Sequence, residues 1–140
     1  MAIPELDNLV RIGKLSKEGS DADEIDGLVA SARARLTDAE NESLHLESRF
    51  DLAYNAAHAL ALAALRWHGY RSDTRYLVFQ CTKHTAGLSP EKSRILDDAH
   101  RKRNMAEYEG QVEVDTAVVN GLTRVARELE KQVDALGPVL

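Results

Sequence analysis

The stretch that decides the fold is Leu44–His68, LHLESRFDLAYNAAHALALAALRWH. Apolar side chains recur in it at steps of three and four, namely at Leu46, Phe50, Ala53, Ala57, Leu60, Ala64 and Trp67. This spacing places them on one face of an α-helix. The seven alanines between positions 53 and 64 favour helix and allow a neighbouring helix to pack closely. We therefore predict a central helix over 44–68, ended by Gly69.

Two helices are expected before the central one. A short helix begins at Ile3-Pro4, because proline suits a first-turn position where its missing N–H costs nothing. We expect the segment 17–20 to end it. A second helix then follows with Ser20 as its N-cap and acidic residues in its first turn, and it runs to about Leu36.

The chain after Gly69 predicts a loop and three further helices. The loop covers 70–73, and no segment shows the period of two that is typical of strands. Ser89-Pro90 is a good helix start and Gly110 a good helix end. The three helices are expected over about 74–85, 90–108 and 115–135.

These elements indicate one domain of the all-α class. The 140 residues suffice for one core and are too few for two ordinary domains. We predict a single up-and-down helical bundle of about five or six helices, with N-terminal helices in 1–40 and the core in 44–136. The N-terminus lacks the apolar run of a signal peptide, and no segment is apolar over the length of a membrane span. The expected location is the cytoplasm, without membrane attachment.

The charge is unevenly distributed. The net charge is −5, yet residues 66–103 carry nine basic and four acidic side chains. Such a basic middle can bind a polyanion locally, or it can be a solvated face that neighbouring acids balance. The chain lacks the overall basicity of a general DNA binder.

The common chemical motifs are missing. The five histidines show no metal-ligand spacing, and the single cysteine adds none, so we expect no metal site. No glycine-rich phosphate loop or nucleophile elbow occurs, and no cofactor is indicated. His58 is interpreted as a helix-flank or satisfied core histidine.

The informative segment is Asp97–Gly110, DDAHRKRNMAEYEG. On a helix, Arg103 shares the inward face with Ile95 and Ala99, where a cation is costly unless it is paired or lies at a cleft. His100, Asn104 and Tyr108 follow one another at steps of four along an adjacent edge. One interpretation is structural, with Arg103 paired to Glu107 or to Asp51. The other is a polar cleft for phosphate or an RNA backbone, for which arginine is the preferred donor.

The pattern Arg103-Asn104-x-x-Glu107-Tyr108, near the end of a penultimate helix, resembles the signature region of HEPN-domain proteins. The segment 49–61, RFDLAYNAAHALA, is similar to the central-helix segment of the same family, and Gly69-Tyr70-Arg71 also fits. The similarity covers about 44–136.

The resemblance implies an up-and-down helical bundle that dimerises. Many HEPN proteins are metal-independent RNases of toxin–antitoxin and defence systems, often encoded beside a nucleotidyltransferase-fold partner. Their motif is an arginine followed, after four to six residues, by a histidine. Here Arg103 matches the arginine and Asn104 the polar residue after it, but Tyr108 stands where the histidine is expected. Tyrosine, with a pKa near 10, moves protons poorly at neutral pH.

Three functions follow as hypotheses. The first is a non-catalytic, homodimeric binding module for a nucleotide, an RNA backbone or a partner protein, with Arg103, Asn104, Glu107 and Tyr108 as binding residues. The second is a metal-independent RNase toxin that uses Arg103 with Tyr108 or His100. The third is a DNA-binding regulator, which the net charge disfavours.

Overall fold

The computed structural model describes residues 3–110 and 114–139, and nearly all regular structure within them is helical. The prediction of an all-α bundle is therefore confirmed. The helices are α1 (Pro4–Arg11), α2 (Ala22–Ala39), α3 (Leu46–Trp67), α4 (Arg75–Gln80), α5 (Thr82–Thr85), α6 (Pro90–Glu109) and α7 (Thr116–Leu136). Two short strands, β1 (Ser16–Lys17) and β2 (Tyr70–Arg71), complete the described structure.

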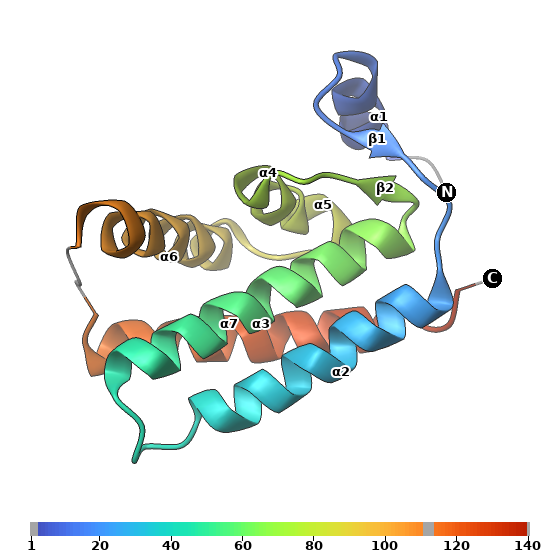
Figure 1. Ribbon diagram of the computed structural model, residues 1–140. Coiled ribbons are helices and arrows are strands. Elements are labelled where there is room, and N and C mark those ends of the chain that lie inside the picture. Colours follow the sequence, from blue (N-terminus) through green and yellow to red (C-terminus); the bar gives the residue numbers. More distant parts are fainter. Residues whose placement is uncertain (1–2, 111–113, 140) are drawn as a thin grey trace.

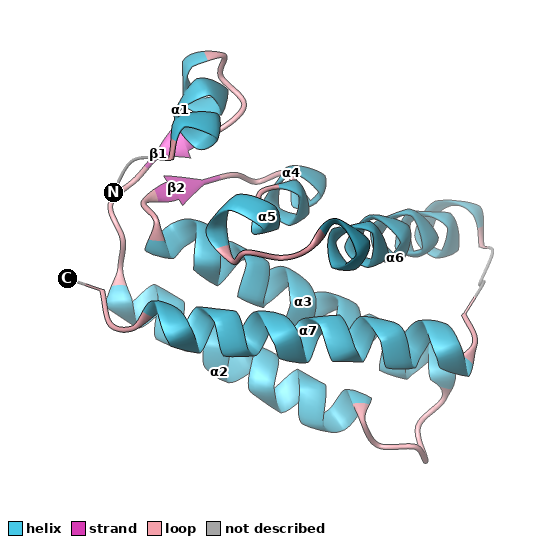
Figure 2. Ribbon diagram, turned by 180° about the vertical axis from the view of Figure 1, so that it is seen from behind, coloured by secondary structure: helices cyan, strands magenta, loops and turns pink. Residues whose placement is uncertain are grey.

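Helix α3 is the centre of the molecule, as its alanine-rich sequence predicted. It packs most extensively against α2 and α7, while α4, α5 and α6 lie on the side of α3 away from α2 (Figures 1 and 2). The chain direction alternates through α2, α3, α6 and α7 (Figure 1), which is the up-and-down arrangement. Six of the seven alanines between positions 53 and 64 are completely buried, so small side chains bring the helices close on several sides.

The boundaries of α6 and α7 follow the capping residues. The Ser89 hydroxyl accepts a hydrogen bond from the Lys92 N–H at 3.4 Å, and Pro90 is the first helical residue. Gly110 ends α6 with a φ of 68°, a left-handed conformation that glycine adopts without strain. Asp115 caps α7 by accepting from the Val118 N–H at 2.8 Å. The predicted start and end of α6 are confirmed.

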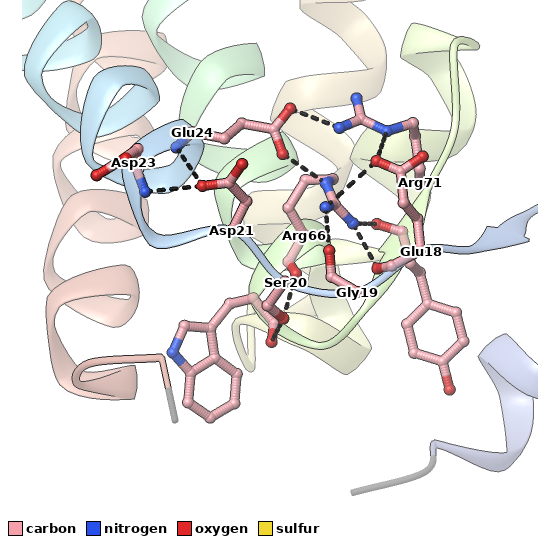
Figure 3. A network of polar contacts seen from close by, with 10 residues as sticks. Glu18, Gly19, Ser20, Asp21, Asp23, Glu24, Arg66 and Arg71 are labelled. Carbon is pink, nitrogen blue, oxygen red and sulfur yellow. Dashed lines mark hydrogen bonds and ion pairs between the residues drawn. The ribbon is translucent and has the colours of Figure 1, made fainter.

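The prediction that Ser20 caps α2 is wrong. The cap is Asp21, whose carboxylate accepts hydrogen bonds from the N–H groups of Asp23 and Glu24 at 3.0 and 3.3 Å. The Ser20 hydroxyl instead lies 2.9 and 2.8 Å from the carbonyl oxygens of Arg66 and Trp67, to which it donates (Figure 3). Ser20 thus satisfies carbonyls at the C-terminal end of α3, which is a long-range partner that local sequence does not reveal.

The predicted end of the first helix and the predicted loop at 70–73 are also wrong in part. Helix α1 ends at Arg11, and Gly13 turns the chain with a φ of 80°. Ser16 and Lys17 then pair antiparallel with Arg71 and Tyr70. Two-residue strands are too short to produce a recognisable alternation in the sequence.

The helix expected over 74–85 is interrupted at Cys81, which separates α4 from α5. Two threonine side chains bond to backbone carbonyls here. The Thr82 hydroxyl donates to the carbonyl of Phe79 at 2.6 Å, and the Thr85 hydroxyl donates to that of Cys81 at 3.1 Å. Such side-chain bonds compete with the helical ladder and bend or break a helix.

A buried arginine fastens the N-terminal segment to the bundle. Arg66 is only 1% exposed, and its guanidinium donates to the Glu24 carboxylate at 2.7 Å and to the carbonyls of Glu18, Gly19 and Tyr70 (Figure 3). Arg71 bridges the carboxylates of Glu18 and Glu24 above it. The charge of Arg66 is therefore fully compensated inside the protein, as burial requires.

Candidate functional site

The candidate residues of α6 lie on two different flanks of that helix. Arg103 and Glu107 line a cavity of about 290 Å³ together with residues of α3. His100, Asn104 and Tyr108 line a groove of about 570 Å³, which Tyr76 of α4 closes from the other side. The structure thus brings His100, Asn104 and Tyr108 together and separates them from the cavity of Arg103.

Arg103 makes the structural contacts that one interpretation of the sequence expected. Its Nη1 lies 3.0 Å from the Glu107 carboxylate, one turn along the helix. Its guanidinium also lies 5.2 Å from the centre of the Tyr54 ring, which is cation–π distance. The cavity beside it contains two further carboxylates, Glu47 and Asp51. Three carboxylates around one guanidinium make this flank unattractive to a phosphate.

His100 has both ring nitrogens engaged. Its Nδ1 lies 3.0 Å from the Tyr54 hydroxyl oxygen, and its Nε2 lies 3.3 Å from Nδ2 of Asn104. Because the Asn104 amide nitrogen can only donate, Nε2 accepts and Nδ1 carries the proton. Burial, with added repulsion from Arg103 and Arg75, lowers the pKa of His100. The imidazole is therefore neutral near pH 7 and holds Asn104 and Tyr54 in place.

Three residues that the sequence did not assign to the site complete this cluster. Tyr54 is fully buried, and burial raises its pKa, so it stays a neutral phenol. Arg75 lies 5.6 Å from the Tyr54 ring centre and donates to the Asn55 amide oxygen at 3.3 Å. His58 packs edge-on to Phe79 at 5.8 Å, and burial together with Arg75 and Arg103 lowers its pKa to about 4.

Of these three, two carried a signal in the sequence. Tyr54 and His58 are four residues apart and are polar interruptions on an alanine-rich helix, which marks one edge of α3. Arg75 carried none, because its approach to Tyr54 depends on how α4 docks on α3. His58 is a partly buried histidine that contacts the Phe79 ring, which agrees with its interpretation as a histidine of the helix flank.

The groove beside α6 exposes two aromatic rings. Tyr76 is 51% exposed and Tyr108 is 78% exposed, and Met105 lies on the same wall. The Tyr76 ring centre lies 6.0 Å from that of His100 at the base of the groove. Apolar ring faces beside a histidine and an amide suit a ligand with a flat apolar face and polar edges.

Charged groups along the groove are partly paired. Asp98 forms an ion pair with Arg101, and Asp97 accepts a hydrogen bond from the Gln80 amide at 2.5 Å. Arg94, at the N-terminal end of the groove, is exposed and forms no ion pair with any residue of 3–110 or 114–139. The charged residues of the groove are two arginines, Arg94 and Arg101, and three carboxylates, Asp97, Asp98 and Glu109. The groove therefore offers one arginine without an ion pair to the described residues and several polar groups, with a small excess of acidic side chains.

Neither a metal cluster nor a membrane-crossing helix occurs in the described parts of the chain. No three histidine, cysteine or carboxylate side chains there are grouped as ligands for one ion. None of the helices combines the length and apolar character that crossing a bilayer requires. No family model, curated protein or solved structure matches this chain, so the similarity to HEPN proteins rests on the residues quoted above.

Proposed function

We propose that this protein is a non-catalytic, HEPN-like binding module that holds a nucleotide or an RNA segment in the groove beside α6. The observation that carries the proposal is the convergence of His100, Asn104 and Tyr108 with Tyr76 on one groove of about 570 Å³. Exposed aromatic rings stack on nucleobases, and amide and imidazole groups can bond to base edges.

The contacts of His100 and Arg103 support binding over catalysis. A general base needs a free nitrogen near the substrate hydroxyl, but both nitrogens of His100 already have protein partners. Arg103, the expected phosphate ligand of a nuclease, is paired with Glu107 and lines the other cavity. Tyr108 is exposed and, among the described residues, forms no hydrogen bond or cation–π contact with Arg103.

The dimer is part of the proposal. An apolar depression between α6 and α7 is lined by Ile95, Ala117, Val118 and Gly121. Ile95 is 37% exposed, so burying this face against a second copy would be favourable. A nucleotidyltransferase-fold partner in a toxin–antitoxin or defence setting is proposed on the HEPN resemblance alone. Sedimentation equilibrium of the wild type beside I95E tests the dimer. A monomeric wild type contradicts it.

The function is tested by measuring binding and cleavage on the same samples. Fluorescence anisotropy with labelled RNA oligonucleotides and with ATP is compared for the wild type, Y108A and R103A, and a cleavage time course is run in EDTA. We expect binding without cleavage, and weaker binding in Y108A. The matched control is R35A on the exposed side of α2, which should bind like the wild type.

The RNase alternative retains one supporting observation. His100 and Arg103 contact opposite parts of the same tyrosine, Tyr54, and His100 is neutral as a base must be. Cleavage by the wild type that R103A abolishes would establish this alternative. If the wild type shows neither binding nor cleavage, both the binding-module proposal and the RNase alternative are overturned.

A further inference from the structure

A second buried arginine lies at the other end of α3. Arg49, in the first turn of the helix, is 7% exposed. Its Nε donates a hydrogen bond to the carbonyl oxygen of Ala39, the last residue of α2, at 2.7 Å. A cation at the C-terminal end of a helix is favoured by the helix dipole, so the position at the end of α2 stabilises part of the charge of the Arg49 guanidinium.

The rest of the Arg49 guanidinium has no partner in the described chain. Arg49 forms no ion pair with any residue of 3–110 or 114–139, and its two Nη atoms make no hydrogen bond there. No described side-chain nitrogen or oxygen is both inaccessible and without a hydrogen-bond partner. The Nη atoms must therefore reach open space, and Arg49 lines a cavity of about 440 Å³.

That cavity collects further cations and donors from α7. Its lining includes Arg124, which is exposed and forms no ion pair with the described residues, and the amide of Asn120. Arg127 also lines it, but its charge is compensated by Glu40 at 2.5 Å and Glu130 at 3.0 Å. The guanidinium groups of Arg49 and Arg124 thus line the cavity without an ion pair to any described residue.

The Nη atoms of Arg49 are open to water where they reach the cavity, but no acid of the described residues forms an ion pair with this guanidinium. An oxyanion in the cavity would supply the missing charge, since guanidinium groups bond to phosphate and carboxylate oxygens in pairs. Glu40 and Glu42 line the same cavity. These acids would repel a long polyanion, so the cavity suits a small anion that fits inside it.

We propose that the cavity formed by Arg49, Arg124 and Asn120 binds a small phosphate group, either as inorganic phosphate or as a phosphomonoester. Two guanidinium groups and one amide match the several oxygens and the double charge of phosphate better than a single carboxylate. This site lies at the end of the bundle where α2 turns into α3, and it is independent of the groove beside α6.

The test is isothermal titration with sodium phosphate and with glycerol 3-phosphate, at constant ionic strength, on the full chain. We expect saturable binding with one site per chain. R124Q should weaken it roughly tenfold or more, because a charged hydrogen bond is lost at an exposed residue whose change leaves the core intact. R35Q changes the net charge equally outside the cavity and should bind like the wild type.

The two phosphate compounds separate the sources of the anion. Tighter binding of glycerol 3-phosphate indicates a metabolite site, and equal or tighter binding of inorganic phosphate indicates a site for the free ion. Either result supports the proposal when R124Q weakens it. The absence of saturable binding by the wild type overturns it, as does an equal effect of R124Q and R35Q. Acetate binding as tight as phosphate overturns the assignment to phosphate.

Discussion

The two ends of α3 bury a cation in opposite ways. At the C-terminal end, Arg66 is 1% exposed and has two carboxylates, those of Glu24 and Glu18, and three carbonyls as partners. At the N-terminal end, Arg49 is 7% exposed and has one carbonyl. The comparison teaches that similar burial does not mean a similar role. A cation whose partners lie inside the protein stabilises the fold, whereas the Nη atoms of Arg49 stay accessible to solvent and to the phosphate group proposed above.

The largest effect on the free energy of unfolding is expected at the C-terminal end of α3, where Arg66 lies. R66M should lower the free energy of unfolding by about 3–5 kcal/mol, because the carbonyls that Arg66 satisfies lose their donor and Glu24 keeps only Arg71 as an ion-pair partner among the described residues. Urea unfolding followed by circular dichroism measures this change. R33M, at an exposed ion pair with Glu130 and Asp134, is the control and should cost no more than about 1 kcal/mol. Equal losses in both variants would contradict the difference between buried and exposed pairs.

The middle of α3 contains a partly buried titratable group, His58. The pKa of His58 is about 4 in the folded protein and about 6.5 when unfolded, so the unfolded state binds more protons between these values. Stability should therefore be full above pH 6.5 and fall as the pH drops toward 4, by roughly 3 kcal/mol at most.

The measurement is the unfolding midpoint in urea at several pH values between 7 and 4. H58L should remove most of the decrease between pH 6.5 and 5, where few carboxylates are protonated. H45L, at an exposed histidine before the same helix, should retain it. A decrease of the same size in H58L would show that another group is responsible.

A smaller effect on the free energy of unfolding is expected at the N-terminal end of α3, where Arg49 lies. R49M should cost about 1–2 kcal/mol in phosphate-free buffer, because the lost bond to Ala39 is offset by removal of an uncompensated buried charge. Added phosphate should raise the melting temperature of the wild type but not of R49M. A loss as large as that of R66M would mean that Arg49 also has a full set of partners in solution.

The smallest effect on the free energy of unfolding is expected at Tyr108, on the exposed flank of α6. Tyr108 is 78% exposed, so Y108A should change the free energy of unfolding by less than about 0.5 kcal/mol while it weakens ligand binding. The same urea unfolding experiment measures this. A large loss of stability would indicate that Tyr108 packs against another chain, since it has little to pack against in its own.

The sequence predicted those features that depend on local periodicity and capping. The run of Leu44–His68 predicted the central helix, and Ser89-Pro90 and Gly110 predicted the bounds of α6. It could not predict that Ser20 would bond to the far end of α3, because the local sequence around Ser20 equally permits the cap that Asp21 provides.

The candidate site was predicted only as a set of neighbours on one helix. Spacing indicated that His100 and Asn104 meet and that Arg103 reaches Glu107, and both contacts are present. The sequence shows that these residues lie on two edges of α6, but which cavity each edge lines depends on where α3 and α4 dock. The proximity of Arg49 to Arg124 likewise arises from packing of α3 on α7, across 75 positions of the sequence.

The pairing of β1 with β2 has a consequence for the order of folding. It joins Ser16 to Arg71, so the chain between them forms a loop that contains α2, the turn after it and α3. Closing a loop of this length carries an entropic cost that only the docked helices can offset. We therefore expect α2 and α3 to pack together first. The pairing of β1 with β2, and the bonds of Arg66 to Glu18 and Tyr70 beside it, should form last. Interactions that form late slow unfolding more than they speed folding. The β1–β2 pairing should therefore have a large influence on the unfolding rate, and so on the lifetime of the native protein.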